Sequence, residues 1–151
     1  GKAIPIGKRE VKKDVARIMV AHGIPYVATA SIGYPLDLMR KVKTALEIEG
    51  PAYIHVHTPC PTGWRFESNK TIEVARLAVQ TGMWVLYEVR QGRLRITYKP
   101  SKLKPVKEYL RTQGRFSHLT DDDIAKIQED IRKRIEEFVE GYRQLGVSVE
   151  A

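Results

Sequence analysis

Hydrophobic residues in the first half of the chain follow two alternating patterns, helical spacing and short runs of consecutive apolar positions. Spacings of three and four residues predict helices over residues 8–21, 35–49 and 69–81. Apolar runs at 25–30 and 52–57, each flanked by glycine or proline, predict buried strands. Strands separated by helices of this length favour parallel pairing through right-handed crossovers, with helices on the faces of the sheet.

The second of these helices has a one-sided apolar pattern that predicts how it packs. Pro35 suits its first turn, and Gly50 followed by Pro51 marks its end. We expect its apolar side to face inward, and this side comprises Leu36, Met39, Val42, Ala45 and Leu46. Because two parallel strands cannot cover both faces of a sheet or settle its edges, we expect residues 1–82 to be the later part of a larger doubly wound parallel sheet.

The second half of the chain predicts a hairpin and an extended appendage. Apolar runs at 83–89 and 93–98 flank Gln91-Gly92, a two-residue connection typical of a β-hairpin. Prolines, lysines and a short helix around 106–112 follow. Together these features define a basic hairpin and appendage over residues 83–118.

The last segment, residues 119–151, predicts one long amphipathic helix. Thr120 followed by three aspartates is typical of a helix start, because the hydroxyl caps the first turn and the carboxylates favour its positive end. Apolar residues then recur every three or four positions, at Ile124, Ile127, Ile131, Ile135, Phe138, Tyr142 and Leu145. Such a helix packs on this domain or on a partner subunit, and the overall class is α/β.

Composition is that of a compact protein. Of the 151 residues, 42% are hydrophobic and 29% are charged. No apolar run reaches the roughly 18 residues that cross a bilayer, and the N-terminus lacks a signal-peptide core, so we expect no membrane partner and a cytoplasmic location. The chain begins at Gly1 rather than at methionine, which indicates a processed subunit or a piece of something longer.

The net charge of +8 is concentrated in one stretch. Between residues 90 and 115 a single acidic residue, Glu108, stands among the basic ones. The basic residues are Arg90, Arg93, Arg95, Lys99, Lys102, Lys104, Lys107, Arg111 and Arg115. One interpretation is a solvated, protected sheet edge, and another is a docking surface for an acidic partner. Nucleic acid fits less well, because few aromatic residues are interleaved for stacking on bases.

Cys60 is the main candidate for a functional residue, because it lies in a loop at the carboxyl end of the second predicted strand, where open α/β sheets bind ligands. A single cysteine forms no internal disulfide and completes no four-cysteine metal site. From the residues alone it is a small buried side chain, a nucleophile activated by a histidine, or a zinc ligand together with His55 and His57. Nucleotide-binding, hydrolase and zinc-protease motifs are absent from the sequence, so spacing leaves the function open.

Several motifs together resemble one enzyme family. They are residues 22–31, Tyr34-Pro35, residues 49–52, residues 57–64 and residues 113–116. In these motifs the sequence closely resembles the β subunit of pyruvate:ferredoxin oxidoreductase and of related 2-oxoacid:ferredoxin oxidoreductases, over nearly the entire chain. The most specific motif is Pro59-Cys60-Pro61-Thr62-Gly63-Trp64.

The resemblance implies a thiamine diphosphate-binding fold and an oxidoreductase that decarboxylates pyruvate and transfers the acetyl group to coenzyme A. Electrons pass through [4Fe–4S] clusters to ferredoxin. Carried onto this sequence, Cys60 is a thiolate ligand of a [4Fe–4S] cluster, and so both the metal-binding and the cofactor-binding residue. No catalytic residue is implied for this chain.

This sequence also departs from the family pattern. The other cluster cysteines are absent, and so is the Gly-Asp-Gly to Asn segment that holds Mg²⁺ and the diphosphate. We therefore expect the C-terminal half of a β subunit, inactive alone and partnered by the upstream half and the other subunits of a hetero-oligomer. The alternative from a different class is a non-catalytic, basic α/β binding module for an acidic partner.

Overall fold

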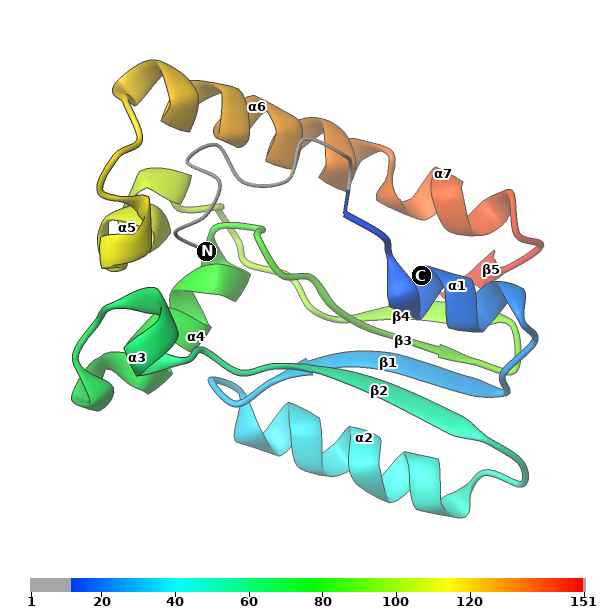
Figure 1. Cartoon of the computed structure of the whole chain (residues 1–151). Helices are drawn as coiled ribbons and strands as arrows, with labels where there is room; N and C mark the ends of the chain where they lie inside the picture. Colours follow the sequence, from blue (N-terminus) through cyan, green and yellow to red (C-terminus); the bar gives the residue numbers. More distant parts are fainter. Residues whose placement is uncertain (1–11, 151) are drawn as a thin grey trace.

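A mixed five-stranded sheet forms the centre of the fold (Figure 1), and the computed structural model describes residues 12–150. The strand order is β2-β1-β3-β4-β5. The strands are β1 (Tyr26–Ser31), β2 (Ala52–His57), β3 (Leu86–Arg90), β4 (Arg93–Tyr98) and β5 (Ser148–Val149). β1 is parallel to β2 and antiparallel to β3, while β4 is antiparallel to β3 and parallel to β5. The α/β class is confirmed, and so is the parallel pairing of the first two strands.

Helices cover both faces of this sheet and one of its ends (Figure 1). Helix α2 lies on one face, and α1 and α7 lie on the other, where α6 continues the layer. At the end where β2 leaves the sheet, α3, α4 and α5 form a separate group. The bounds are α1 (Val15–Ala21), α2 (Pro35–Glu47), α3 (Pro61–Trp64), α4 (Thr71–Gln80), α5 (Val106–Arg111), α6 (Asp121–Glu136) and α7 (Phe138–Arg143), with 3-10 turns at Ser68–Lys70 and Gly114–Phe116.

The predicted hairpin is confirmed, and its turn follows from local chemistry. Gln91 and Gly92 both have positive φ, 48° and 75°, which is the conformation of a type I′ turn. This turn matches the right-handed twist of β3 and β4, so Arg90 pairs directly with Arg93. The hairpin joins the sheet because β3 also pairs with β1. The division into three domains at residues 82 and 118 stays a prediction.

Two apolar cores account for the shape of the C-terminal segment. Helix α6 contributes Ile124 and Ile131 to a core with α4 and α5, whereas α7 contributes Tyr142 to a second core on the sheet. The prediction of one long helix is wrong, because the helix is interrupted at Glu137. As a result α6 packs in the first core and α7 in the second. Strand β5 after α7 was not predicted.

The start of the first helix also differs from expectation. Of the predicted helix over residues 8–21, the first positions lie outside the described residues, and the structure begins α1 at Val15. The Asp14 carboxylate accepts a hydrogen bond of 3.0 Å from the Arg17 backbone N–H, which caps this start. Within residues 12–150 no helix is both long and apolar enough to cross a membrane.

The predicted inward stripe of α2 is wrong. Of its five residues, Leu36, Met39, Val42 and Leu46 are exposed and Ala45 is half-buried, whereas the residues of this helix that are fully buried against the sheet are Asp37 and Lys41. The physical reason is that the polar atoms beneath α2 give Lys41 a complete set of hydrogen-bond acceptors. Its ammonium group donates to the Thr29 carbonyl at 2.7 Å, to Asp37 at 2.6 Å and to Thr97 at 2.7 Å.

Candidate functional site

Cys60 begins a tight turn at the carboxyl end of parallel strand β2, as predicted. It is the N-cap residue of α3, and Pro61 occupies the first helical position. The Gly63 backbone N–H donates to the Cys60 Sγ at 3.4 Å, and the Trp64 N–H donates to the Cys60 carbonyl at 2.9 Å. The thiol is exposed, so the expectation of a small buried side chain is wrong. These hydrogen bonds hold the turn, and they therefore orient the Cys60 sulfur at the surface of the protein.

Gly63 leaves room for the Cys60 sulfur in this turn. A Cβ at this position would lie 3.2 Å from the Cys60 sulfur, closer than most real contacts of this kind. With a larger residue, the sulfur or the backbone of the turn would have to move by a few tenths of an ångström. The glycine thus fixes how closely the backbone approaches the thiol.

The two most distinctive sequence motifs meet at this turn, although they are about 50 residues apart in the chain. The Arg115 guanidinium lies 3.8 Å from the centre of the Trp64 ring and 4.4 Å from that of Phe116. The Gly114 N–H donates to the Arg65 carbonyl at 2.9 Å. A Cβ on Gly114 would lie 2.9 Å from the Arg65 Cβ, so glycine is needed there. We call Gly114, Arg115 and their contacts with Trp64 and Arg65 the Arg115 clamp.

A buried side chain orients the arginine of the Arg115 clamp. Gln113 is 1% exposed, its carbonyl oxygen accepts from the Arg115 Nε at 2.9 Å, and its amide donates to the Tyr109 carbonyl at 2.9 Å. No carboxylate among the described residues forms an ion pair with Arg115. Burial lowers the pKa of Arg115, but a guanidinium keeps its charge at neutral pH. The Arg115 clamp therefore places an uncompensated positive charge against the wall of the Cys60 turn.

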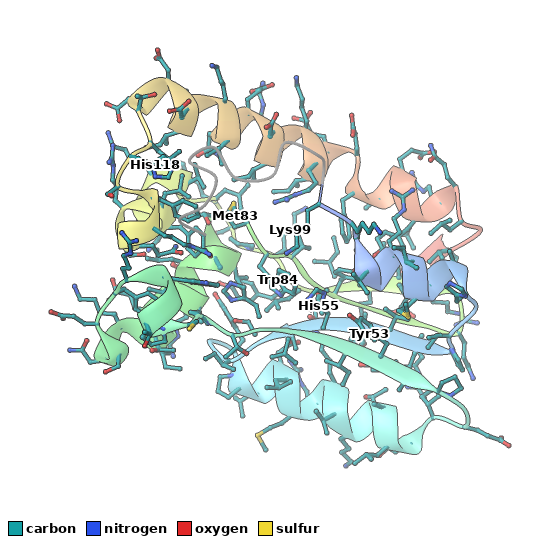
Figure 2. All side chains as sticks on the ribbon, viewed as in Figure 1. Tyr53, His55, Met83, Trp84, Lys99 and His118 are labelled. Atoms are coloured by element: carbon teal, nitrogen blue, oxygen red, sulfur yellow. The ribbon has the colours of Figure 1, made fainter. Side chains whose placement is uncertain are left out.

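Two histidines from β2 form an aromatic cluster beside the turn. The His55 and His57 rings lie 4.9 Å and 5.4 Å from the Trp84 ring, measured between centroids, and Figure 2 shows His55 and Trp84 next to each other. The Trp84 indole N–H donates to the Ala30 carbonyl at 2.9 Å. His57 is also 5.8 Å from the Trp64 ring, which connects this cluster to the Cys60 turn.

Both histidines are held in their neutral form. Burial, aided by the positive charge of Arg115, lowers the pKa of His57 to about 4. Burial likewise lowers the pKa of His55. The His57 Nδ1 is buried without a hydrogen-bond partner in the described part of the chain. A neutral imidazole tolerates this environment better than an imidazolium does.

Neither chemical alternative for Cys60 receives support from the geometry. Within residues 12–150, no three His, Cys, Asp or Glu side chains are grouped as a metal site would require, so the zinc interpretation with His55 and His57 finds no such cluster. The hydrogen bond described for the Cys60 sulfur is to the Gly63 N–H and not to a histidine base.

The basic stretch is not one continuous positive surface. Several of its residues are engaged by acidic partners: Arg95 by Glu88, Lys104 by Glu108, and Lys107 and Arg111 by Asp121. Arg115 is stacked on aromatic rings. Sequence reasoning counted these charges correctly and named Glu108 among them, but it did not identify Asp121 and Trp64 as partners, because both lie outside the stretch.

Trp84 and the stacking role of Arg115 were not predicted as parts of the site. Gln113 through Phe116 had stood out as a motif, but spacing alone did not indicate which turn it contacts. Trp84 precedes a strand and has no local signal that distinguishes it from a core residue. In both cases the contacts that bring the residue into the site are with side chains far away in the sequence.

Known proteins resemble the chain over most of its length, although no protein-family profile matches it. It is 59% identical over 123 residues to pyruvate synthase subunit PorB of Methanothermobacter marburgensis, a match covering 82% of this chain and 43% of the relative. It is also 59% identical over 128 residues to the subunit of that name from Methanocaldococcus jannaschii, covering 85% and 43%. Ketoisovalerate oxidoreductase subunit VorB of Pyrococcus abyssi is 48% identical over 132 residues, covering 83% and 42%. The chain thus spans less than half the length of these curated relatives.

Proposed function

From its confirmed resemblance to the β subunits of 2-oxoacid:ferredoxin oxidoreductases, we propose that this chain is the C-terminal half of such a subunit in pyruvate:ferredoxin oxidoreductase. The enzyme would decarboxylate pyruvate oxidatively, form acetyl-CoA and pass electrons through [4Fe–4S] clusters to ferredoxin. The observation that carries the proposal is the Cys60 turn, where the two most distinctive motifs meet at the carboxyl end of a parallel strand.

Cys60 fits the role of one thiolate ligand of a [4Fe–4S] cluster. Its sulfur is exposed, lies between two prolines, and accepts a backbone N–H, a type of hydrogen bond that stabilises cluster sulfur ligands. The sequence holds no second cysteine, so the remaining ligands come from outside this chain. When bound, the cluster supplies one-electron transfer.

The residues around Cys60 would do three things for such a cluster. The Arg115 clamp holds Trp64 and so fixes the turn that aims the sulfur. Its positive charge favours an anionic group at the site, because no carboxylate in the described residues neutralises it. Neutral His57 and the rings of Trp64 and Trp84 limit the access of water from the side of the sheet.

The sequence lacks the Gly-Asp-Gly to Asn segment that, by the family resemblance, would hold thiamine diphosphate and Mg²⁺. No group of three His, Cys, Asp or Glu side chains that could hold a metal ion is found within residues 12–150. We propose that the upstream half of the subunit holds both groups. This chain would then contribute one cluster ligand and its surroundings, with the other subunits, ferredoxin, pyruvate and CoA as partners in a cytoplasmic assembly.

The alternative of a basic binding module would rest on fewer charges than the sequence suggested. Arg90 and Arg93 flank the hairpin turn, both are exposed, and neither forms an ion pair within the described part of the chain. Lys102 is likewise exposed and forms no ion pair within the described residues, so Arg93 and Lys102 together test the docking of acidic ferredoxin. Charge reversal at Arg93 and Lys102 that left ferredoxin reduction and its salt dependence unchanged would remove the docking role.

The proposal is tested by cluster content in the complete assembly. The chain is co-expressed with the rest of the subunit and the other subunits, as wild type, as Cys60→Ser and as Thr62→Ser, a control in the same exposed turn. We expect Cys60→Ser to lower the iron content and change the low-temperature electron paramagnetic resonance signal, and the control to match wild type. An unchanged signal in Cys60→Ser, or wild-type assembly without pyruvate-dependent ferredoxin reduction, would contradict the proposal.

A further inference from the structure

Helix α2 has its polarity reversed relative to the sheet that it covers. Four of its large apolar residues are exposed, with Leu36 at 74%, Met39 at 66%, Val42 at 43% and Leu46 at 83%, while Leu38 is half-buried. Asp37 and Lys41, in contrast, are 7% and 1% exposed and face the sheet. A helix at a protein surface normally shows the opposite arrangement, so this outward stripe is typical of an interface. We call these four apolar residues the α2 stripe.

The α2 stripe cannot be hidden by turning the helix. Lys41 uses its three N–H groups on Thr29 of β1, Thr97 of β4 and Asp37 of α2 itself, so two of the three acceptors belong to the sheet beneath the helix. Rotation that brought the stripe onto the sheet would carry Lys41 into solvent and leave the Thr29 carbonyl without this donor. The exposed stripe is therefore fixed by the ion pair and is a stable feature of the surface.

The strand beside α2 is also unprotected. Strand β2 lies at the edge of the sheet and pairs with β1, and no described residue pairs with its outer edge. Its sequence, Ala52–His57, holds no residue that is charged at neutral pH, because both histidines are neutral. Natural edge strands are usually guarded by charges, prolines or bulges, so an unguarded edge is typical of a strand that continues a sheet.

We propose that the α2 stripe and the outer edge of β2 are the docking surface for the part of the β subunit that this chain lacks. This inference rests on the proposed function. The relatives extend well beyond the match, which covers 43% of their length, so more than half of each lies outside it. That remainder is long enough to supply a further strand and the helices that a parallel sheet requires.

The partner chemistry follows from the surface. The partner would offer an extended strand with free N–H and C=O groups to the edge of β2, and an apolar face to the α2 stripe. The stripe is bordered by exposed Arg40 and Lys43, so acidic residues at the rim of the partner face would fit. Neither a ligand nor the ferredoxin partner is required for this contact.

Photocrosslinking in the complete assembly identifies the occupant. Met39 is replaced by p-benzoylphenylalanine in the chain co-expressed with the other parts of the enzyme, and Glu136 on α6, which is 67% exposed, is the matched control position. We expect crosslinks from position 39 to the remainder of the β subunit, and none to it from position 136. Crosslinks to a second copy of this chain, to a different subunit, or to nothing in a formed assembly would each overturn the inference.

A pair of charge substitutions gives an independent measure. We expect Met39→Lys with Leu46→Lys to weaken association with the remainder of the subunit by about tenfold or more, because hot-spot side chains have effects of this size. The urea midpoint of the chain alone should not change, since both side chains are exposed there. Unchanged association would overturn the inference. Failure of the wild-type parts to form any enzyme would instead count against the proposed function.

Discussion

The two faces of the sheet are covered by opposite kinds of side chain. On the face under α1 and α7, apolar residues pack together, including Val27, Val89 and Leu94. On the face under α2, the Lys41–Asp37 pair lies beside a second polar group, in which Glu88 accepts hydrogen bonds from Tyr26 at 2.7 Å and from Arg95 at 3.0 Å. The first face is stabilised by burial of apolar area, and the second by completed hydrogen bonds.

The difference explains why the helices on one side of the sheet, which we call the closed side, bury or half-bury most of their apolar residues, whereas α2 on the other side, the open side, exposes most of its own. On the apolar face Ala16 of α1 and Tyr142 of α7 are buried, and Ile18 is the one large apolar side chain of these two helices that is exposed, at 40%. On the polar face the ion pair occupies the inward positions of α2, so its apolar residues point away. Burial lowers the pKa of Lys41 and Asp37 opposes this, so the charged pair depends on both partners.

The largest expected effect comes from breaking the polar face. Lys41→Met leaves Asp37 buried without its ammonium partner, which should destabilise the chain by about 3 to 5 kcal/mol in urea unfolding. The double variant Lys41→Met with Asp37→Leu removes both charges and should recover most of the loss. A single variant with wild-type stability would show that the ion pair does not hold α2 in place.

A smaller effect is expected from the apolar face. Leu94 is fully buried between β3 and α7, and Leu94→Ala should cost about 3 kcal/mol through lost burial and a residual cavity. Unlike Lys41→Met, this loss should not be recovered by a second substitution that removes a charge. Urea unfolding of Leu94→Ala with and without Asp37→Leu checks this difference, and rescue by Asp37→Leu would contradict it.

The neutral histidine next to the Cys60 turn makes stability depend on pH. The pKa of His57 is about 4 in the folded chain and about 6.5 when unfolded, so the unfolded state binds the proton more readily. Its contribution is fully present above pH 6.5 and is lost as pH falls toward 4, with a slope of at most about 1.4 kcal/mol per pH unit. His57→Phe should flatten this part of the stability curve. An unchanged slope would contradict a buried neutral histidine.

The Arg115 clamp gives the next smaller effect. Arg115→Ala removes the cation from the Trp64 ring and should cost about 1 kcal/mol, and Arg115→Lys should recover only part of this. Because the clamp orders the Cys60 turn, cleavage within this turn by limited proteolysis should become faster in Arg115→Ala. Arg111→Ala, which affects an exposed pair with Asp121, is the control and should leave the rate unchanged.

Features set by local chemistry could be predicted from the sequence. The Gln91-Gly92 turn and the Thr120 cap are examples, and in the structure Thr120 and Asp123 form reciprocal hydrogen bonds of 3.2 Å and 2.9 Å. The place of Cys60 at the carboxyl end of β2 followed from the order of elements. In each case the relevant residues are within a few positions of one another.

Features that depend on distant partners could not be predicted. Periodicity located the apolar side of α2 correctly but gave no information on which side meets the sheet. That choice depends on Lys41 reaching Thr29 and Thr97, which are 12 and 56 residues away. The Arg115–Trp64 contact was missed for the same reason, because both motifs were visible and their proximity was not.

The smallest expected effect is the sharpest test of the comparison between the two faces. Met39 is 66% exposed on α2, so Met39→Ala should change the stability of the chain alone by no more than about 0.5 kcal/mol, although a buried methionine would cost several times more. Urea unfolding of Met39→Ala beside Leu94→Ala compares apolar truncations on the open and closed sides under identical conditions. Equal losses would mean that α2 buries its apolar residues in this chain after all, and that Lys41 does not determine which side of the helix meets the sheet.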